Sequence, residues 1–154
     1  MSGYIEKGVI RLHEKVGTDI WRMQAELPLT AKEAKPGQFV HVSVNDSCKL
    51  LRRPISIAGT DPMKGLVEII YRVVGEGTER LSYMKVGDKI DSLGPLGTSF
   101  SVNATHIVGV GGGVGIASGL AMEAVPTCTV QAPAIINSAT SFPVMIPPRP
   151  QTGT

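Results

Sequence analysis

The sequence has few of the residues that metal centres require. Its 154 residues include two cysteines and three histidines, which are far apart along the chain: Cys48, Cys128, His13, His41 and His106. This spacing does not match the ligand patterns of zinc or iron–sulfur centres, so we predict no metal site. Each histidine is expected to be a strand or surface residue. Two isolated thiols also favour a reduced state and a cytoplasmic location.

Charge and hydropathy argue against two further classes. The 15 basic and 13 acidic residues give a net charge of +2 without a basic stripe, and aromatic residues make up only 5% of the chain. Nucleic acid is therefore not an expected partner. Glycine and proline interrupt every apolar run before the roughly 20 residues that a membrane span needs. The first residues also lack the apolar centre of a secretory signal, so no membrane association is expected.

The first hundred residues alternate short strand-like segments with turn residues. We expect six strands, at residues 4–13, 20–27, 38–44, 55–60, 66–74 and 89–93. A short helix is expected over residues 78–84, with Thr78 able to cap its first turn. Closely spaced strands broken by glycine and proline predict a mainly β fold, either a small antiparallel barrel or a sandwich.

The pattern changes after Val102. Residues 105–110 have the composition of a buried strand, and residues 116–124 that of a helix rich in small side chains. Between them lies a turn rich in glycine that includes Gly111, Gly112, Gly113 and Gly115. Strand, glycine turn and helix together resemble one βα unit of a parallel nucleotide-binding sheet.

The last segment, residues 125–154, has a different composition. It contains six prolines and one charged residue, Arg149, and it has neither a helical nor an alternating period. We therefore expect three parts: a β domain over residues 1–101, the start of an α/β domain over 102–124, and an irregular Pro-rich tail over 125–154. Such an abrupt change is what a longer protein cut short at its C-terminal end would produce.

The run Arg53-Pro54-Ile55-Ser56 is the most informative stretch of the chain. Arg53 offers a planar fork of donors suited to a diphosphate. Pro54 fixes its own φ and has no N–H to leave unpaired. Ser56 can present a small donor or acceptor to a ring nitrogen. Taken alone, the run is weak evidence for a site, because such a string is usually a turn that carries a surface arginine.

A second stretch begins about 20 residues later and strengthens the first. Gly77 would let the backbone approach a phosphate closely, and Thr78 would open a helix whose N–H groups favour an anion. Arg72 could add a phosphate or ribose contact, and Tyr71 could stack on a ring. An apolar slot for the ring would come from Pro54, Ile55 and Ile70.

Together, the two stretches predict a binding site for flavin adenine dinucleotide (FAD). The cofactor needs positive charge and backbone donors for its diphosphate, an apolar slot for its ring and a controlled hydrogen bond at ring atom N5. Ser56 is the candidate partner of N5. Glu76 would be unfavourable beside a diphosphate, so we expect its side chain to point to solvent.

These motifs, with Gln38-Phe39-Val40 and the run from Leu93 to Gly97, resemble those of the ferredoxin reductase superfamily. More narrowly, residues 4–122 resemble electron-transfer subunits of type B dihydroorotate dehydrogenase. The resemblance implies a six-stranded antiparallel barrel that holds FAD, followed by a pyridine-nucleotide domain and a two-iron two-sulfur segment. It implies FAD contacts for Arg53, Pro54, Ile55, Ser56, Ile70, Tyr71, Arg72, Gly77 and Thr78.

The resemblance also implies an oxidoreductase function in pyrimidine biosynthesis, within a heterotetramer. Electrons from dihydroorotate, oxidised at a flavin of the catalytic dihydroorotate dehydrogenase subunit, would pass through the iron–sulfur cluster to FAD and then to NAD. The chain departs from the family in two respects. Its cysteines are too few for a four-ligand cluster, and its glycine turn does not satisfy G-x-G-x-x-G.

These departures leave alternatives open. The glycine turn is either a nicotinamide-side nucleotide turn or a plain strand-to-helix turn, and no catalytic residue is predicted. The chain could instead be another reductase of the superfamily that passes electrons to a different partner, such as a hydrogenase or a sulfur-reducing complex. It could also be a barrel that acts only as an interaction module.

Overall fold

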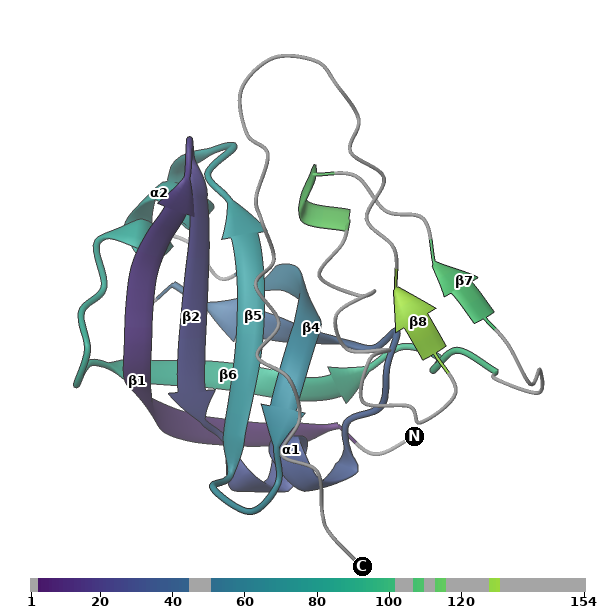
Figure 1. Cartoon of the computed structure of the whole chain (residues 1–154). Coiled ribbons are helices and arrows are strands. Elements are labelled where there is room, and N and C mark those ends of the chain that lie inside the picture. The colour runs from purple at the N-terminus through teal and green to yellow at the C-terminus, as the bar shows by residue number, and fades with distance from the viewer. Residues whose placement is uncertain (1–2, 45–50, 102–106, 110–112, 116–127, 131–154) are drawn as a thin grey trace, which may run out of the picture.

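Six strands close into an antiparallel barrel in the computed structural model, which describes residues 3–44, 51–101, 107–109, 113–115 and 128–130 (Figure 1). The strands are β1 (Tyr4–Gly17), β2 (Ile20–Glu26), β3 (Phe39–Ser43), β4 (Arg53–Asp61), β5 (Leu66–Arg72) and β6 (Lys89–Leu96). Their order around the barrel is β1-β2-β5-β4-β3-β6. The prediction of a mainly β fold with a six-stranded antiparallel barrel is confirmed.

The long first strand closes the barrel. Residues Tyr4–Val9 pair with β6, whereas residues Ile10–Gly17 pair with β2, with register shifts along the second half. At Gly8, near the end of the first half, an added Cβ would lie 2.1 Å from the carbonyl oxygen of Glu26. Only glycine leaves room for this approach of two backbones.

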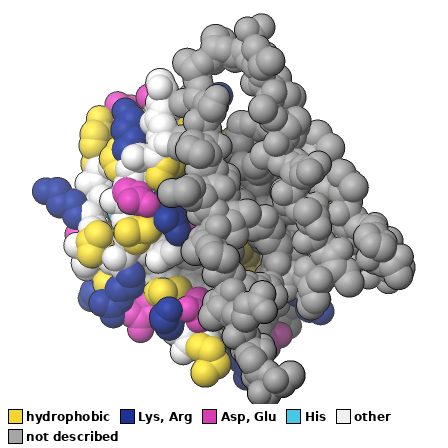
Figure 2. Space-filling model, in the orientation of Figure 1, with side chains coloured by type: hydrophobic (Ala, Val, Ile, Leu, Met, Phe, Trp, Pro, Cys, Tyr) yellow, Lys and Arg dark blue, Asp and Glu magenta, His cyan; other side chains and the backbone are white. Residues whose placement is uncertain are grey.

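The barrel interior is filled by alternate side chains of the strands. Ile10, Met23, Val40, Ile57 and Ile90 are each at most 2% exposed. The outer face of β1, β2 and β5 is polar, and there Arg22 is ion-paired with Glu68 (2.7 Å) and Glu14 (3.3 Å). Figure 2 shows basic, acidic and apolar side chains intermixed on one face of the barrel.

Helix α1 (Pro28–Glu33) lies at the lower end of the barrel in Figure 1, where the sequence predicted only a connection. Its own N-cap residue provides no side-chain cap. Instead, the buried carboxylate of Glu6 on β1 accepts hydrogen bonds from the N–H groups of Leu29 (2.9 Å) and Thr30 (2.8 Å) and from the Thr30 hydroxyl. A helix capped from another strand carries no local capping signal, which is why it was missed.

Helix α2 (Glu76–Ser82) lies at the opposite end of the barrel and begins two residues earlier than predicted. Gly75 is its N-cap residue and Thr78 is the third residue of its first turn, so Thr78 does not begin the helix, but its side chain caps the first turn by accepting from the Gly75 N–H. Among the described residues, no helix is long and apolar enough to cross a membrane.

Three short elements lie beyond the barrel: β7 (Ile107–Gly109), the 3₁₀ turn η1 (Gly113–Gly115) and β8 (Cys128–Val130). The strands β7 and β8 pair in parallel, which requires a crossover connection and agrees with an incomplete α/β unit. Strand β8 corrects the prediction that residues 125–154 are irregular throughout. The predicted helix over 116–124 and the rest of the predicted tail lie outside the described residues, and the three-part division of the chain stays a prediction.

The carboxylate of Glu6 should contribute measurably to stability. In Glu6→Gln the side chain loses its charge and one of its two acceptor oxygens, so the free energy of unfolding should fall by about 1 to 2 kcal/mol. Urea unfolding followed by circular dichroism measures this difference. Glu33→Gln removes an exposed carboxylate from the same helix and should change stability by less than about 0.5 kcal/mol. Equal stability of the two variants would contradict the capping role.

Candidate functional site

The two sequence motifs meet at one end of the barrel. Arg53 is the first residue of β4, and Gly77 is a buried residue in the first turn of α2. The guanidinium lies directly against the Gly77 backbone, because an added Cβ there would be 2.1 Å from Nε and 2.7 Å from Cζ of Arg53. Because Gly77 has no side chain, the guanidinium of Arg53 can lie directly beside the first turn of α2.

The two consecutive arginines have different environments. Arg52 forms an ion pair with Asp91 (2.7 Å) and donates to the carbonyl oxygens of His41 and Asp91 (3.4 Å each). Arg53 donates to the carbonyl oxygen of Leu51 (3.1 Å). Since a carboxylate already holds Arg52, Arg53 is the better candidate for binding an anion.

The Thr78 side chain organises the loop before α2. Its hydroxyl oxygen accepts from the N–H groups of Val74 (3.0 Å) and Gly75 (3.3 Å), and the hydroxyl donates to the Gly75 carbonyl oxygen (2.9 Å). The hydroxyl is thus used within the protein. The N–H groups of Gly77 and Thr78 lie in the first turn of a helix, where N–H groups lack intrahelical acceptors. These residues can offer a phosphate backbone donors rather than a side chain.

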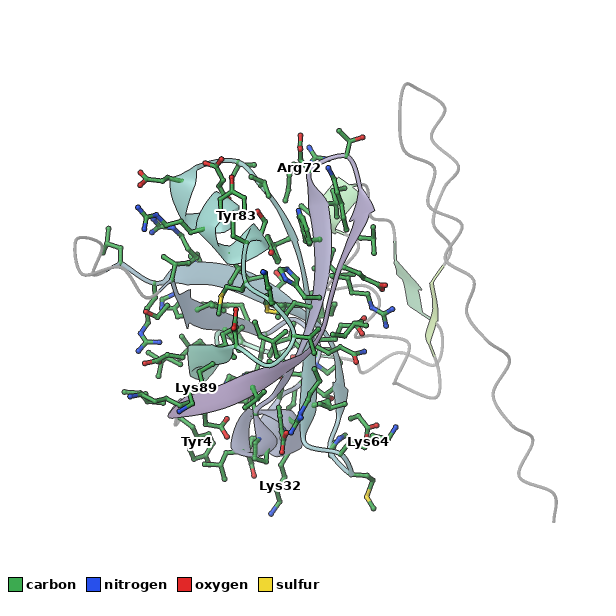
Figure 3. The ribbon with its side chains drawn as sticks, turned by 90° about the vertical axis from the view of Figure 1, so that its left-hand side faces the viewer. Tyr4, Lys32, Lys64, Arg72, Tyr83 and Lys89 are labelled. Atoms are coloured by element: carbon green, nitrogen blue, oxygen red, sulfur yellow. The ribbon has the colours of Figure 1, made fainter. Side chains whose placement is uncertain are left out.

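The neighbouring outer face of β4 and β5 combines apolar and polar side chains. Pro54 is exposed and Ser56 is partly exposed on β4, and Ile70 is partly exposed on β5. The buried pair Ile57 and Ile69 fixes the register, so that Ser56 and Ile70 fall on the outer side of adjacent strands. Arg72 is exposed at the end of β5, and Figure 3 shows it at the same end of the molecule as Tyr83, which follows α2.

Two predicted contact residues have their side chains inside the barrel. Ile55 is 6% exposed and Tyr71 is 3% exposed, and both belong to the hydrophobic core. This corrects the expectation that Ile55 forms part of an outer slot and that the Tyr71 ring stacks on a cofactor. The physical reason is the strand alternation, since the inward Ile57 and Ile69 place every second residue of each strand inside.

Tyr71 is instead hydrogen-bonded to a residue that the sequence did not single out. Its hydroxyl lies 2.8 Å from Nε2 of His13, and Nδ1 of His13 lies 2.7 Å from the carbonyl oxygen of Met84. Because a carbonyl can only accept, Nδ1 carries a proton, and in the neutral ring Nε2 then accepts from the Tyr71 hydroxyl. The Trp21 ring lies 4.7 Å from the imidazole, centroid to centroid. Burial raises the pKa of Tyr71 well above its ordinary value.

Two aromatic rings flank the outer face beside Ser56. Phe39 pairs with Ser56 and His41 pairs with Pro54 across β3 and β4, and their ring centroids are 5.4 Å apart. Val40, between them, and Val42, after His41, are buried on the inner face of the strand. The alternation of residues 39–42 was a signal that could have identified these two rings as neighbours of the site.

The glycine turn is only partly described. Gly113 and Gly115 lie in η1, which is next to β5 (Figure 1), whereas Gly111 and Gly112 fall outside the described residues. Its role in binding a nucleotide stays a prediction. Among the described residues, no group of three or more histidine, cysteine, aspartate or glutamate side chains could hold a metal ion.

The raised pKa of Tyr71 predicts a loss of stability at alkaline pH. In the unfolded chain Tyr71 loses its proton near its ordinary pKa of 10.0, whereas in the folded chain it keeps the proton to higher pH. The stabilising contribution is therefore complete below that pH and declines above it. In Tyr71→Phe the free energy of unfolding should fall less between about pH 9 and about pH 11 than in the wild type. Urea unfolding across this range tests the difference, and identical slopes would contradict it.

The described barrel matches known proteins. The sequence profile of a family described as "Oxidoreductase FAD-binding domain" matches residues 7–100. The chain is 44% identical over 107 residues to the electron transfer subunit of dihydroorotate dehydrogenase B (NAD(+)) from Shouchella clausii, covering 66% of this chain and 41% of that protein. Its identity to the corresponding subunit of Desulforamulus reducens is 41% over 120 residues, or 76% and 45% of the two chains. The chain spans less than half the length of these relatives.

Solved structures agree with the sequence matches. The structure of an NADH-dependent reduced ferredoxin-NADP oxidoreductase, from work on flavin-based electron bifurcation, superimposes with a TM-score of 0.74 and 33% identity. That match covers 81% of this chain and 46% of the other. Phthalate dioxygenase reductase, with a TM-score of 0.66 and 19% identity over 83% of this chain and 42% of its own, supports the fold alone.

Proposed function

The chain belongs to the oxidoreductase FAD-binding domain family, and from this premise we propose that residues 53–78 bind FAD for electron transfer. The observation that carries the proposal is that the Arg53 guanidinium lies against the backbone of Gly77. Any side chain at position 77 would overlap the guanidinium. A cation and a bare backbone side by side at a barrel end suit a diphosphate. The residues present therefore fit the cofactor that the family implies.

The parts of the site have distinct roles in this proposal. Arg53 and the N–H groups of Gly77 and Thr78 would hold the diphosphate. Arg72, exposed at the end of β5, would add a second phosphate or ribose contact. The ring would lie on the outer face formed by Pro54, Ser56 and Ile70.

The chemistry is divided between protein and cofactor. Bound FAD would supply the redox chemistry, accepting and donating electrons at its ring. The protein would place the ring and adjust its hydrogen bonding, with the Ser56 hydroxyl as the candidate partner of N5. Ile55 and Tyr71, whose side chains are inside the barrel, would support the site through packing and through their backbone.

The relatives extend the proposal to a partner and a pathway. Because curated relatives named as electron transfer subunits of dihydroorotate dehydrogenase B are 41–44% identical, we propose that this chain acts beside a dihydroorotate-oxidising subunit in pyrimidine biosynthesis. NAD binding would use the unit that begins with β7 and η1. The two cysteines of this sequence cannot ligate an iron–sulfur cluster by themselves. Other reductases of the superfamily would share the FAD site and differ in the partner they serve.

Arg53→Ala tests the FAD site directly. Loss of a charge-assisted contact to phosphate should raise the dissociation constant for FAD about 10- to 100-fold, as measured by quenching of FAD fluorescence. The matched control is Arg52→Ala, which removes the adjacent arginine and its ion pair with Asp91. That variant should lose stability in urea but keep its affinity for FAD within about threefold. Unchanged FAD affinity in a folded Arg53→Ala protein would refute the site.

Co-expression tests the proposed partner. A tagged dihydroorotate-oxidising subunit from a bacterium that encodes type B relatives should retain this chain through affinity and size-exclusion steps. An unrelated tagged flavoprotein of similar size serves as the control. If the two chains elute separately and FAD is still bound to this one, the proposal of an FAD site holds and the proposal of a dihydroorotate-oxidising partner is wrong.

A further inference from the structure

His13 joins two elements that border the proposed FAD site. Its imidazole accepts from the hydroxyl of Tyr71, the penultimate residue of β5, and donates to the carbonyl oxygen of Met84, just beyond α2. The segment between these two contacts holds Arg72, the loop before α2, and α2 itself. A single ring on β1 thus contacts the chain at both ends of that segment.

The two hydrogen bonds depend on each other. The Met84 carbonyl requires a proton on Nδ1, which in the neutral ring leaves Nε2 without one and able to accept from Tyr71. The Tyr71 hydroxyl is buried, so it would bear a desolvation cost without this partner. If either hydrogen bond is removed, the imidazole ring is held less firmly in the orientation that the other hydrogen bond needs.

Other contacts also hold the same region. The N–H of Val73 donates to the Asp19 carbonyl oxygen (2.7 Å), which ties the end of β5 to the hairpin between β1 and β2. Leu81 of α2 is fully buried in the core. Leu81 belongs to the same hydrophobic cluster as Ile69 and Tyr71 of β5, so packing holds α2 on the barrel, and His13 adds directional hydrogen bonds at both ends of the segment.

We propose that His13 is a positioning residue of the FAD site, and that it fixes α2 relative to β5. The inference rests on the proposed function, because Gly77 and Thr78 lie on α2 and the ring face lies partly on β5. When α2 and β5 are correctly spaced, one FAD molecule can contact the N–H groups of Gly77 and Thr78 and also the outer face of β4 and β5. Without His13, α2 opens locally while the barrel stays folded.

Three variants separate the two ends of this connection. In His13→Asn the shorter amide lies near the position of Nδ1 and can still reach the Met84 carbonyl, but not Tyr71. In His13→Gln the amide lies near the position of Nε2 and can still accept from Tyr71. Tyr71→Phe removes only the hydroxyl. The double variant His13→Asn/Tyr71→Phe should lose no more than either single variant.

Hydrogen exchange of the cofactor-free protein tests the connection independently of FAD. The amide of Glu79 donates to the Gly75 carbonyl oxygen (2.9 Å) within α2, and the amide of Ile57 donates to the Gln38 carbonyl oxygen (3.0 Å) within the barrel. In each single variant, exchange of the Glu79 amide should become about two- to tenfold faster, while that of Ile57 stays unchanged. Equal acceleration at both amides would show a general loss of stability and overturn the proposal.

FAD affinity tests the consequence for the site. The dissociation constant should rise by about two- to tenfold in the same variants, in parallel with the exchange of α2. Faster exchange of α2 with unchanged FAD affinity would overturn the positioning role, as would weaker affinity without faster exchange. If the wild-type protein takes up no FAD, the proposed function fails, and the exchange measurement still decides whether His13 holds α2.

Discussion

The structure depends on the way β1 closes the barrel. One strand pairs with β6 along its first half and with β2 along its second, and the change occurs where Gly8 lies against the Glu26 backbone. A side chain at Gly8 would separate β1 from the end of β2, so the hydrogen bonds on one side of the strand would be lost. Closure also brings Glu6 to the N-terminus of α1, which covers one end of the barrel.

Closure determines where a ligand can bind. Antiparallel pairing of β4 with β5 places the start of β4 and the end of β5 at the same end of the barrel, and α2 follows directly from β5. For this reason Arg53 lies against Gly77, which follows it by 24 residues in the chain, and Arg72 lies at the same end of the barrel. The other end is covered by α1 and lies near Lys32 and Lys64 (Figure 3).

Much of the barrel and of the candidate site could be predicted from the sequence, because they depend on patterns of neighbouring residues. Turn residues and β-branched segments indicated six strands, and the two motifs contain Arg53 and Gly77, which the fold brings into contact. What failed depended on contacts distant in sequence. Helix α1 is capped by Glu6, 23 residues before Leu29, and no local signal marks it.

The position of Tyr71 is a different case. Its motif suggested a ring contact, but strand alternation places the side chain beside Val67 and Ile69, and applying that rule first would have predicted a core residue.

The neighbouring arginines show why motif and structure must be considered together. Both precede Pro54, and the sequence alone gives each the same charge and donors. The difference comes from β6, where Asp91 lies within 2.7 Å of Arg52 and neutralises it, leaving Arg53 to reach α2. Arg52, just before β4, therefore binds to β6, and Arg53 provides charge at the site. A diphosphate bound there would meet the Arg53 guanidinium and the backbone donors of α2, so its orientation would depend on where α2 lies as much as on charge.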